Sequence, residues 1–138
     1  MKYIVNSLEE TEKLAQNFAK ELEIGQVVLL NGDLGAGKTT FTQFVFAALG
    51  VKEIVTSPTF AILKSYKSDL CTLHHFDMYR INEEEAIESG FDEILGDSTT
   101  IRFVEWSDNV SALLPNKCVV VNIKLIDDNK REFEIIYE

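Results

Sequence analysis

A glycine-rich segment near the start of the chain constrains the fold more than any other feature. Residues 32–39 read G-D-L-G-A-G-K-T, which matches in full the P-loop pattern of four free positions between a glycine and glycine-lysine-threonine. The apolar run Val27–Leu30 precedes this loop, and residues 41–49 after it have the apolar spacing of a helix that buries one face. Strand, glycine loop and helix in this order are the context that the motif requires, and they predict an α/β fold.

Each residue type in this loop has a chemical reason to be there. Glycines at 32, 35 and 37 allow positive φ and let backbone N–H groups approach phosphate oxygens closely. The Lys38 ammonium can reach the β- and γ-phosphates, and the Thr39 hydroxyl can ligate the Mg²⁺ that bridges them, at a helix N-terminus whose dipole favours anions. The residues expected to contact a nucleoside triphosphate here are Asp33, Leu34, Gly35, Ala36, Gly37, Lys38, Thr39 and Thr40.

Length and composition indicate one globular domain that spans residues 1–138, with 46% hydrophobic residues. No apolar run approaches the roughly 18 residues that a membrane-spanning helix needs, and the first residues lack a secretory apolar stretch. We therefore expect a cytoplasmic protein without membrane contact. The cysteines, Cys71 and Cys118, are far apart and have no metal-binding spacing, which indicates two free thiols.

The chain is strongly acidic, with a formal net charge of -10 and a pI of about 4.6. An acidic surface repels the phosphate backbone of nucleic acids, which lysine and arginine normally bind. Tight and direct binding of tRNA or DNA by this chain is therefore disfavoured. The charge is consistent with a basic protein partner and equally with a well-solvated surface that has no partner.

Two further strands are predicted to end in a carboxylate. The segment Cys71–Phe76 leads into Asp77, and Thr100–Trp106 is apolar enough for a central strand with Glu105 near its end, as in a Walker B segment. Beside a P-loop such acids hold Mg²⁺ or orient water, although Asp77 could instead pair with Arg80 on a surface turn. The expected catalytic residues are Lys38, Asp77 and Glu105. The expected metal ligands are Thr39 and Glu105.

Several residues near these motifs have more than one interpretation. The segment Ser57–Phe60 is either a switch that senses the γ-phosphate or, more simply, a turn with hydroxyl caps, and the turn is favoured. Thr11 is expected to be a solvated residue of the first helix. Trp106 either packs in the core, which is the commoner outcome, or lies near the nucleotide or a partner. His74 and His75 point to opposite faces of their strand, so they do not readily clamp one metal ion together.

The remaining segments complete a P-loop NTPase-like fold of three layers, in which a mixed, mostly parallel central sheet carries β-hairpin additions. The elements expected from the sequence are a strand at Lys2–Val5, a helix from a Ser7 capping box to about Leu22, a β-like stretch at Val51–Thr56, a hairpin of Ala61–Tyr66 with Cys71–Phe76, a short helix after Asn82, another at Ser107–Leu114, and a terminal hairpin of Cys118–Ile126 with Arg131–Tyr137.

These features predict a magnesium-dependent nucleoside triphosphatase. A GTPase is disfavoured because no N-K-x-D motif, which reads guanine, is present in the sequence. A small-molecule kinase is the stronger alternative, but such kinases use several arginines in a lid and acceptor site. This chain has only Arg80, Arg102 and Arg131.

Four motifs in order make the chain resemble the bacterial TsaE (YjeE) family. They are G-D-L-G-A-G-K-T-T at 32–40, S-P-T-F at 57–60, H-F-D-M-Y-R at 75–80 and E-W at 105–106. Their order, their spacing and the total length fit, so the resemblance covers nearly the whole chain. It implies a small ATPase required for the threonylcarbamoyladenosine modification of tRNAs that read codons beginning with adenine.

The resemblance also implies cofactors and partners. ATP and Mg²⁺ would be the cofactors, and the pair TsaB and TsaD would be the partners, with TsaD transferring the group and tRNA contacted only indirectly through the complex. This chain would hydrolyse ATP slowly alone, faster with the pair, and would license or reset the cycle. A nucleotide-gated binding module without essential hydrolysis is the second possibility.

Residue roles carried over from the resemblance extend the site. Thr11 matches a threonine that approaches the nucleotide, and Asp77 resembles the family's second essential acid. Arg131 lies where a basic residue approaches the base, although Asp128–Lys130 departs from the usual glycine-containing pattern. The residues implied in switching or partner contact are Ser57, Pro58, Thr59, Phe60, Tyr79, Arg80 and Trp106.

Overall fold

One mixed β-sheet organises the chain in the computed structural model, which describes residues 1–33 and 35–138. Its seven strands have the order β1-β7-β6-β2-β5-β4-β3. They are β1 (Lys2–Val5), β2 (Val27–Asn31), β3 (Leu63–Lys67), β4 (Thr72–Asp77), β5 (Ile101–Glu105), β6 (Val119–Leu125) and β7 (Arg131–Tyr137). The central strands β6, β2, β5 and β4 run parallel, and β3 at one edge pairs antiparallel with β4. At the other side β7 pairs antiparallel with β6, and the edge strand β1 pairs antiparallel with β7. The predicted mixed sheet with hairpin additions is therefore confirmed.

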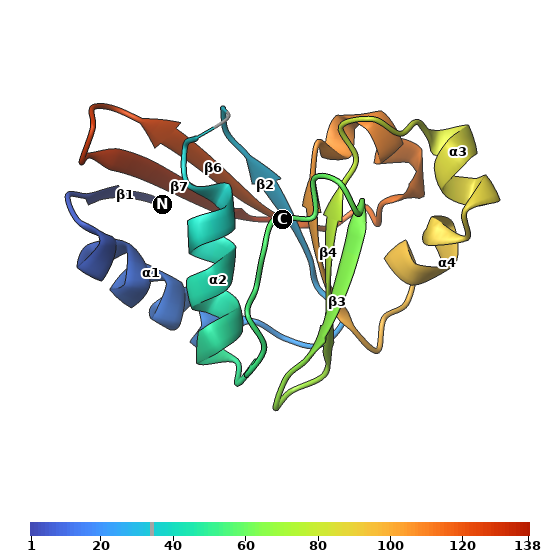
Figure 1. Cartoon of the computed structure of the whole chain (residues 1–138), viewed down its shortest axis with the longest axis horizontal. Helices are drawn as coiled ribbons and strands as arrows, with labels where there is room; N and C mark the ends of the chain where they lie inside the picture. Colours follow the sequence, from blue (N-terminus) through green and yellow to red (C-terminus); the bar gives the residue numbers. More distant parts are fainter. Residues whose placement is uncertain (34) are drawn as a thin grey trace.

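Helices cover both faces of this sheet, which gives three layers (Figure 1). On one face lie α1 (Leu8–Glu21) and α2 (Lys38–Ala48). On the other lie α3 (Glu83–Glu88), α4 (Phe91–Leu95) and the 3₁₀ helix η1 (Ser107–Leu113). Among the described helices, none is both long enough and apolar enough to cross a membrane.

The starts of α1 and α3 follow the capping signals in the sequence. At α1 the Ser7 hydroxyl accepts a hydrogen bond from the Glu10 N–H at 3.1 Å. At α3, Asn82 and Glu85 form a reciprocal capping box, with the Asn82 side chain accepting from the Glu85 N–H at 2.8 Å. Such side-chain acceptors satisfy N–H groups that have no partner within the helix.

Aromatic rings hold α2 against the sheet. The ring centroid of Phe41 lies 5.5 Å from that of Phe18 and 5.1 Å from that of Phe133. One turn further along α2, Phe46 lies 5.0 Å from Phe103 of β5. All of these rings are buried. Because Phe41 is in the first turn of α2, this packing also fixes the glycine loop that precedes the helix.

The β-like stretch expected at Val51–Thr56 is wrong, because this segment is irregular. Side chains rather than a strand ladder hold it: Gln43 of α2 donates to the Val55 carbonyl at 2.6 Å, and Lys64 donates to the Thr56 hydroxyl. Val55 is buried in the apolar cluster beneath α2. The segment therefore follows the helix instead of extending the sheet.

The cysteines are free thiols, as expected. Cys118 is buried and Cys71 is partly buried. Burial raises the pKa of both thiols, so neither is poised to act as a thiolate.

Replacing Phe41 by Ala should lower the free energy of unfolding by about 3–5 kcal/mol, because it opens a cavity at the junction of α1, α2 and β7. Urea denaturation followed by circular dichroism measures the change. Phe60→Ala is the matched control, since this side chain is 89% exposed and its loss should change the unfolding free energy by about 0.5 kcal/mol or less. Equal effects of the two substitutions would contradict this account of the core.

Candidate functional site

The glycine loop connects β2 to the N-terminus of α2. Gly35 and Gly37 have φ values of +83° and +112°, which glycine adopts without strain. Gly37 is the N-cap of α2, and no side chain among the described residues caps this helix. Its first N–H groups and the positive end of its dipole are therefore available to an anion. Leu34, predicted as part of this loop site, lies outside the described residues.

Gly32 has no room for a side chain. A Cβ built there would lie 2.7 Å from the Ile123 carbonyl oxygen of β6 and 3.3 Å from the Ala36 methyl group. Real Cβ atoms do not approach backbone oxygen so closely. Strand β6 thus dictates a glycine at the point where β2 enters the loop.

Arg131, the first residue of β7, holds the loop from the side. Its Nε donates to the Ala36 carbonyl at 2.8 Å. A Cβ on Gly37 would lie 3.2 Å from the same nitrogen. The guanidinium therefore places a positive charge against the loop and leaves little room for a side chain at position 37.

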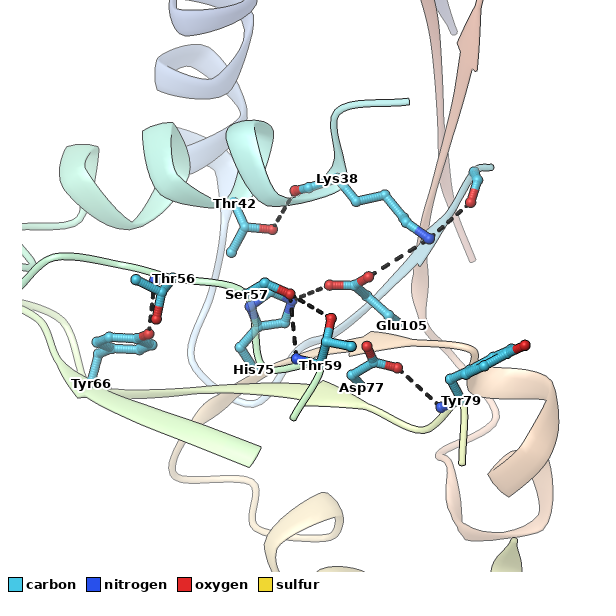
Figure 2. A network of polar contacts seen from close by, with 11 residues as sticks. Lys38, Thr42, Thr56, Ser57, Thr59, Tyr66, His75, Asp77, Tyr79 and Glu105 are labelled. Atoms are coloured by element: carbon cyan, nitrogen blue, oxygen red, sulfur yellow. Dashed lines mark hydrogen bonds and ion pairs between the residues drawn. The ribbon is translucent and has the colours of Figure 1, made fainter. Parts of the chain in front are cut away.

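The Lys38 ammonium is held inside the loop (Figure 2). Its Nζ donates to the Gly32 carbonyl at 2.8 Å and lies 3.7 Å from Oε1 of Glu105. The residue is 9% exposed. A buried ammonium needs such partners, and a phosphate oxygen could replace either of them.

Asp77 and Glu105 lie side by side because β4 and β5 are parallel neighbours. The register of the two strands pairs these residues directly, and both are buried. One oxygen of Asp77 accepts from the Tyr79 N–H at 3.0 Å. The alternative of a surface pair between Asp77 and Arg80 is wrong, because Asp77 is buried and no such ion pair occurs among the described residues.

His75 joins this acidic pair although it was not among the predicted site residues. It is fully buried, and its Nε2 lies 2.7 Å from Oε2 of Glu105. The available signal was strand alternation, because His75 and Asp77 are two residues apart and share a face. The adjacent His74 lies on the other face, as alternation predicted, and its Nδ1 forms a hydrogen bond with the Ser65 hydroxyl at 2.7 Å. Burial lowers the pKa of His74, which disfavours its charged form.

Trp106 is not in the core, so the commoner outcome expected for it is wrong. Its backbone is left-handed with φ of 56°, and the side chain is 47% exposed. The turn after β5 directs the ring over the loop, where it lies 5.4 Å from Lys38 Nζ and 4.7 Å from the Tyr79 ring. The two rings pack together beside the ammonium, which lies over the Trp106 ring.

The segment Ser57–Phe60 is the hydroxyl-capped turn that was expected. The hydroxyls of Ser57 and Thr59 are 2.7 Å apart, and the Pro58 carbonyl accepts from the Ile62 N–H at 2.7 Å. Phe60 projects into solvent. This turn also borders the site, because both hydroxyl residues line the cavity described next.

A cavity of about 520 Å³ brings these segments together. Its lining residues are Gly35, Gly37, Lys38, Thr39, Thr40, Ser57, Thr59, Asp77, Tyr79, Arg80, Glu105, Trp106 and Arg131. Every one of them was a predicted site residue. Another hollow, of about 570 Å³, lies between α1, α2 and the β3–β4 turn, and the glycine loop does not contribute to it.

The other predicted residues lie around this cavity without lining it. Ala36 and Pro58 are buried, whereas Asp33 and Phe60 are exposed. Thr11 borders a small adjoining hollow together with Gly37. Thr11 is only 3% exposed, so the expectation of a solvated residue is wrong.

The chemistry of the lining fits a polyphosphate with a bound cation. Lys38, Arg80 and Arg131 supply positive charge for phosphate oxygens, in a chain whose net charge is -10. The Thr39 hydroxyl and the buried carboxylates supply the oxygen ligands that Mg²⁺ prefers. Among the described residues no group of three His, Cys, Asp or Glu side chains could hold a metal alone. Phosphate oxygens and water would therefore have to complete the coordination.

Replacing Gly37 by Ala should weaken binding of ADP with Mg²⁺ about tenfold or more, because the new methyl group displaces Arg131 and disturbs the N–H groups that face the anion. Isothermal titration calorimetry gives the affinity. Gly90→Ala is the matched control, since Gly90 also has positive φ, at +79°, but an added Cβ meets nothing within 4 Å. Both variants should lose about 1–2 kcal/mol of stability from backbone strain. Equal nucleotide affinity in the two would disprove the assignment.

Comparisons with known proteins agree on one family. A family model described as "Threonylcarbamoyl adenosine biosynthesis protein TsaE" matches residues 5–133. A Rickettsia bellii protein named "tRNA threonylcarbamoyladenosine biosynthesis protein TsaE" is 42% identical over 137 residues, covering 98% of this chain and 94% of the relative. A Bacillus subtilis protein of the same name is 40% identical over 124 residues, covering 90% of this chain and 77% of the relative. The crystal structure of Bacillus subtilis YdiB superposes with a TM-score of 0.83 at 34% identity, covering 99% of this chain and 84% of that one.

Proposed function

The chain belongs to the TsaE family, whose role is in tRNA threonylcarbamoyladenosine biosynthesis, and from this membership and its loop site we propose that it is a magnesium-dependent P-loop ATPase. The observation that carries the proposal is the convergence of Lys38, Asp77 and Glu105 on one cavity beside the free N-terminus of α2. A phosphate-binding loop with two buried acids has the parts that nucleotide hydrolysis requires.

The residue roles follow from the contacts. Lys38 exchanges its bond to the Gly32 carbonyl for the phosphates, so binding does not leave its charge unpaired. Thr39 and Glu105 would hold Mg²⁺, which would supply positive charge against the charge that develops on the phosphates. Asp77 orients the attacking water from the neighbouring strand end.

Adenine is favoured as the base because the sequence lacks N-K-x-D, the motif that reads guanine. Thr11 and Arg131 border the small hollow next to Gly37 and are the candidates to approach the base. The phosphates occupy the cavity of about 520 Å³ that Lys38 lines, and the base occupies the side of the loop near α1.

TsaB and TsaD are the proposed partners, with group transfer on TsaD and with hydrolysis here licensing or resetting the cycle. Phe60, Tyr79 and Trp106 are 89%, 58% and 47% exposed around the cavity, where a protein partner could cover them. Ser57 and Thr59 line the cavity a few residues before Phe60, so this turn could transmit the state of the nucleotide to the partner. The net charge of -10 favours contact with tRNA through the partners instead of through this chain.

The kinase alternative is weaker because one of the three arginines serves the fold. Arg102 is 2% exposed and donates to the Asp97 and Gly25 carbonyls at the opposite end of the sheet. Only Arg80 and Arg131 line the cavity. If both arginines contact the nucleotide phosphates, no further arginine remains to bind the acceptor of a kinase reaction.

ATP hydrolysis by the chain alone and with TsaB–TsaD tests the proposal. We expect slow turnover alone, clear stimulation by the pair, and a fall of about 100-fold or more in Lys38→Ala, because the charge on the phosphates is lost. Phosphate release is the readout. A phosphorylated small-molecule product in place of inorganic phosphate would indicate a kinase, and a lack of stimulation would exclude partner gating.

Glu105→Gln and Asp77→Asn separate hydrolysis from nucleotide-gated binding. Each keeps the shape of the side chain but removes its charge, so turnover should fall about 100-fold or more while ATP remains bound. Modification of tRNA by the complete set of proteins is then measured with each variant. Loss of modification supports an ATP-driven cycle, whereas full modification without hydrolysis would show that binding alone is sufficient.

A further inference from the structure

The hydrogen bond between His75 and Glu105 is short and shielded from water. Its Nε2–Oε2 distance is 2.7 Å, and the two residues are 0% and 5% exposed. Hydrogen bonds to a carboxylate strengthen where water is excluded. Figure 2 shows the Glu105 carboxylate between the His75 ring and the Lys38 ammonium.

The imidazole is the donor in this contact. Lys38 Nζ forms an ion pair with the other oxygen, Oε1, at 3.7 Å, and a carboxylate in an ion pair only accepts hydrogen bonds. Within the described residues, His75 Nδ1 is buried without a hydrogen-bond partner. A proton on Nδ1 would therefore be buried and unpaired, which is costly. The geometry favours a ring protonated at Nε2 and bare at Nδ1.

The ring of His75 cannot reach the cavity. It lies edge-on to the Phe46 ring, with centroids 6.2 Å apart and planes at 75°, and it does not line the cavity. A side chain with no exposed surface does not touch a bound nucleotide. Any effect of His75 on the site has to act through Glu105.

We propose that His75 is a positioning residue that fixes the Glu105 carboxylate. By donating to Oε2 it holds this acid away from Lys38 and leaves Oε1 facing the cavity. Without that bond the carboxylate can rotate onto the ammonium, and a tight Lys38–Glu105 ion pair would withhold both groups from phosphate and Mg²⁺. The occupant of the cavity rests on the proposed function, whereas the hydrogen bond and its donor do not. Hydrogen-bonded partners of this kind commonly orient the carboxylates at metal sites.

Two amide substitutions separate the hydrogen bond from packing. In His75→Gln the amide nitrogen can take the place of Nε2, whereas in His75→Asn the shorter side chain reaches only the position of Nδ1. Both replace the ring by a similar polar group, so loss of ring packing is common to the two. The difference between them therefore reports the donor to Glu105.

Three measurements on the full chain test the proposal. Nitrogen-15 spectra of the nucleotide-free protein should show His75 protonated at Nε2. The affinity for ADP in EDTA should fall in His75→Asn, because the ion pair withholds Lys38 from phosphate, and should stay within about threefold in His75→Gln. The gain in affinity on adding Mg²⁺ and the ATP turnover should fall about 10–100-fold in His75→Asn and about threefold or less in His75→Gln. Urea denaturation gives the stability loss of each variant.

Equal Mg²⁺ dependence and turnover in the two variants would overturn the proposal, whether both match the wild type or both fall together with stability. A ring protonated at Nδ1 would overturn it as well. Failure of the proposed ATPase function looks different, because the wild type would then neither bind ADP nor hydrolyse ATP. The nitrogen-15 spectra would still decide the direction of the hydrogen bond.

Discussion

A buried ammonium next to a buried carboxylate is the interaction on which this site depends. Lys38 would be costly to bury alone, and the Gly32 carbonyl and Glu105 make its position tolerable. Neither partner saturates it, since the carboxylate is 3.7 Å away, and the ammonium also lies over the Trp106 ring, 5.4 Å from its centroid. The charge is thus kept oriented but is not neutralised by a close ion pair. An anion that enters the cavity meets a cation already aimed at it.

The parallel centre of the sheet makes this arrangement possible. Strands β2, β5 and β4 end at the same edge, so three segments distant in sequence deliver the loop, Glu105 and Asp77 to adjacent positions. The carboxyl ends of parallel strands are where α/β proteins commonly bind ligands. The antiparallel strands at both edges contribute differently: β7 supplies Arg131 beside the loop, and β3 anchors the turn that contains Ser57 and Thr59 through Lys64.

Periodicity and motifs predicted most of the fold, since the strands, the longer helices and both strand-end acids are where alternation and helical spacing placed them. What they missed depends on contacts between segments. Val51–Thr56 has β-rich composition, but Gln43 of α2 captures its backbone. Trp106 is apolar, but a left-handed turn directs it outward. His75 becomes part of the site only because β5 places Glu105 against it, and no spacing within one strand specifies that partner.

The glycines of this one motif are required for two different reasons, strand packing at Gly32 and the binding loop at Gly35 and Gly37. A side chain at Gly32 would collide with the Ile123 carbonyl of β6, whereas at Gly37 it would crowd the flexible Arg131 side chain and strain the backbone. The first glycine is therefore imposed by the closeness of two strands, and would be needed even in a descendant that had lost all affinity for phosphate. Gly35 and Gly37 instead serve the binding of the anion and the packing of Arg131 beside the loop. In a related chain that no longer binds phosphate, we would expect Gly35 and Gly37 to be replaced first and Gly32 to persist for as long as β6 remains beside β2.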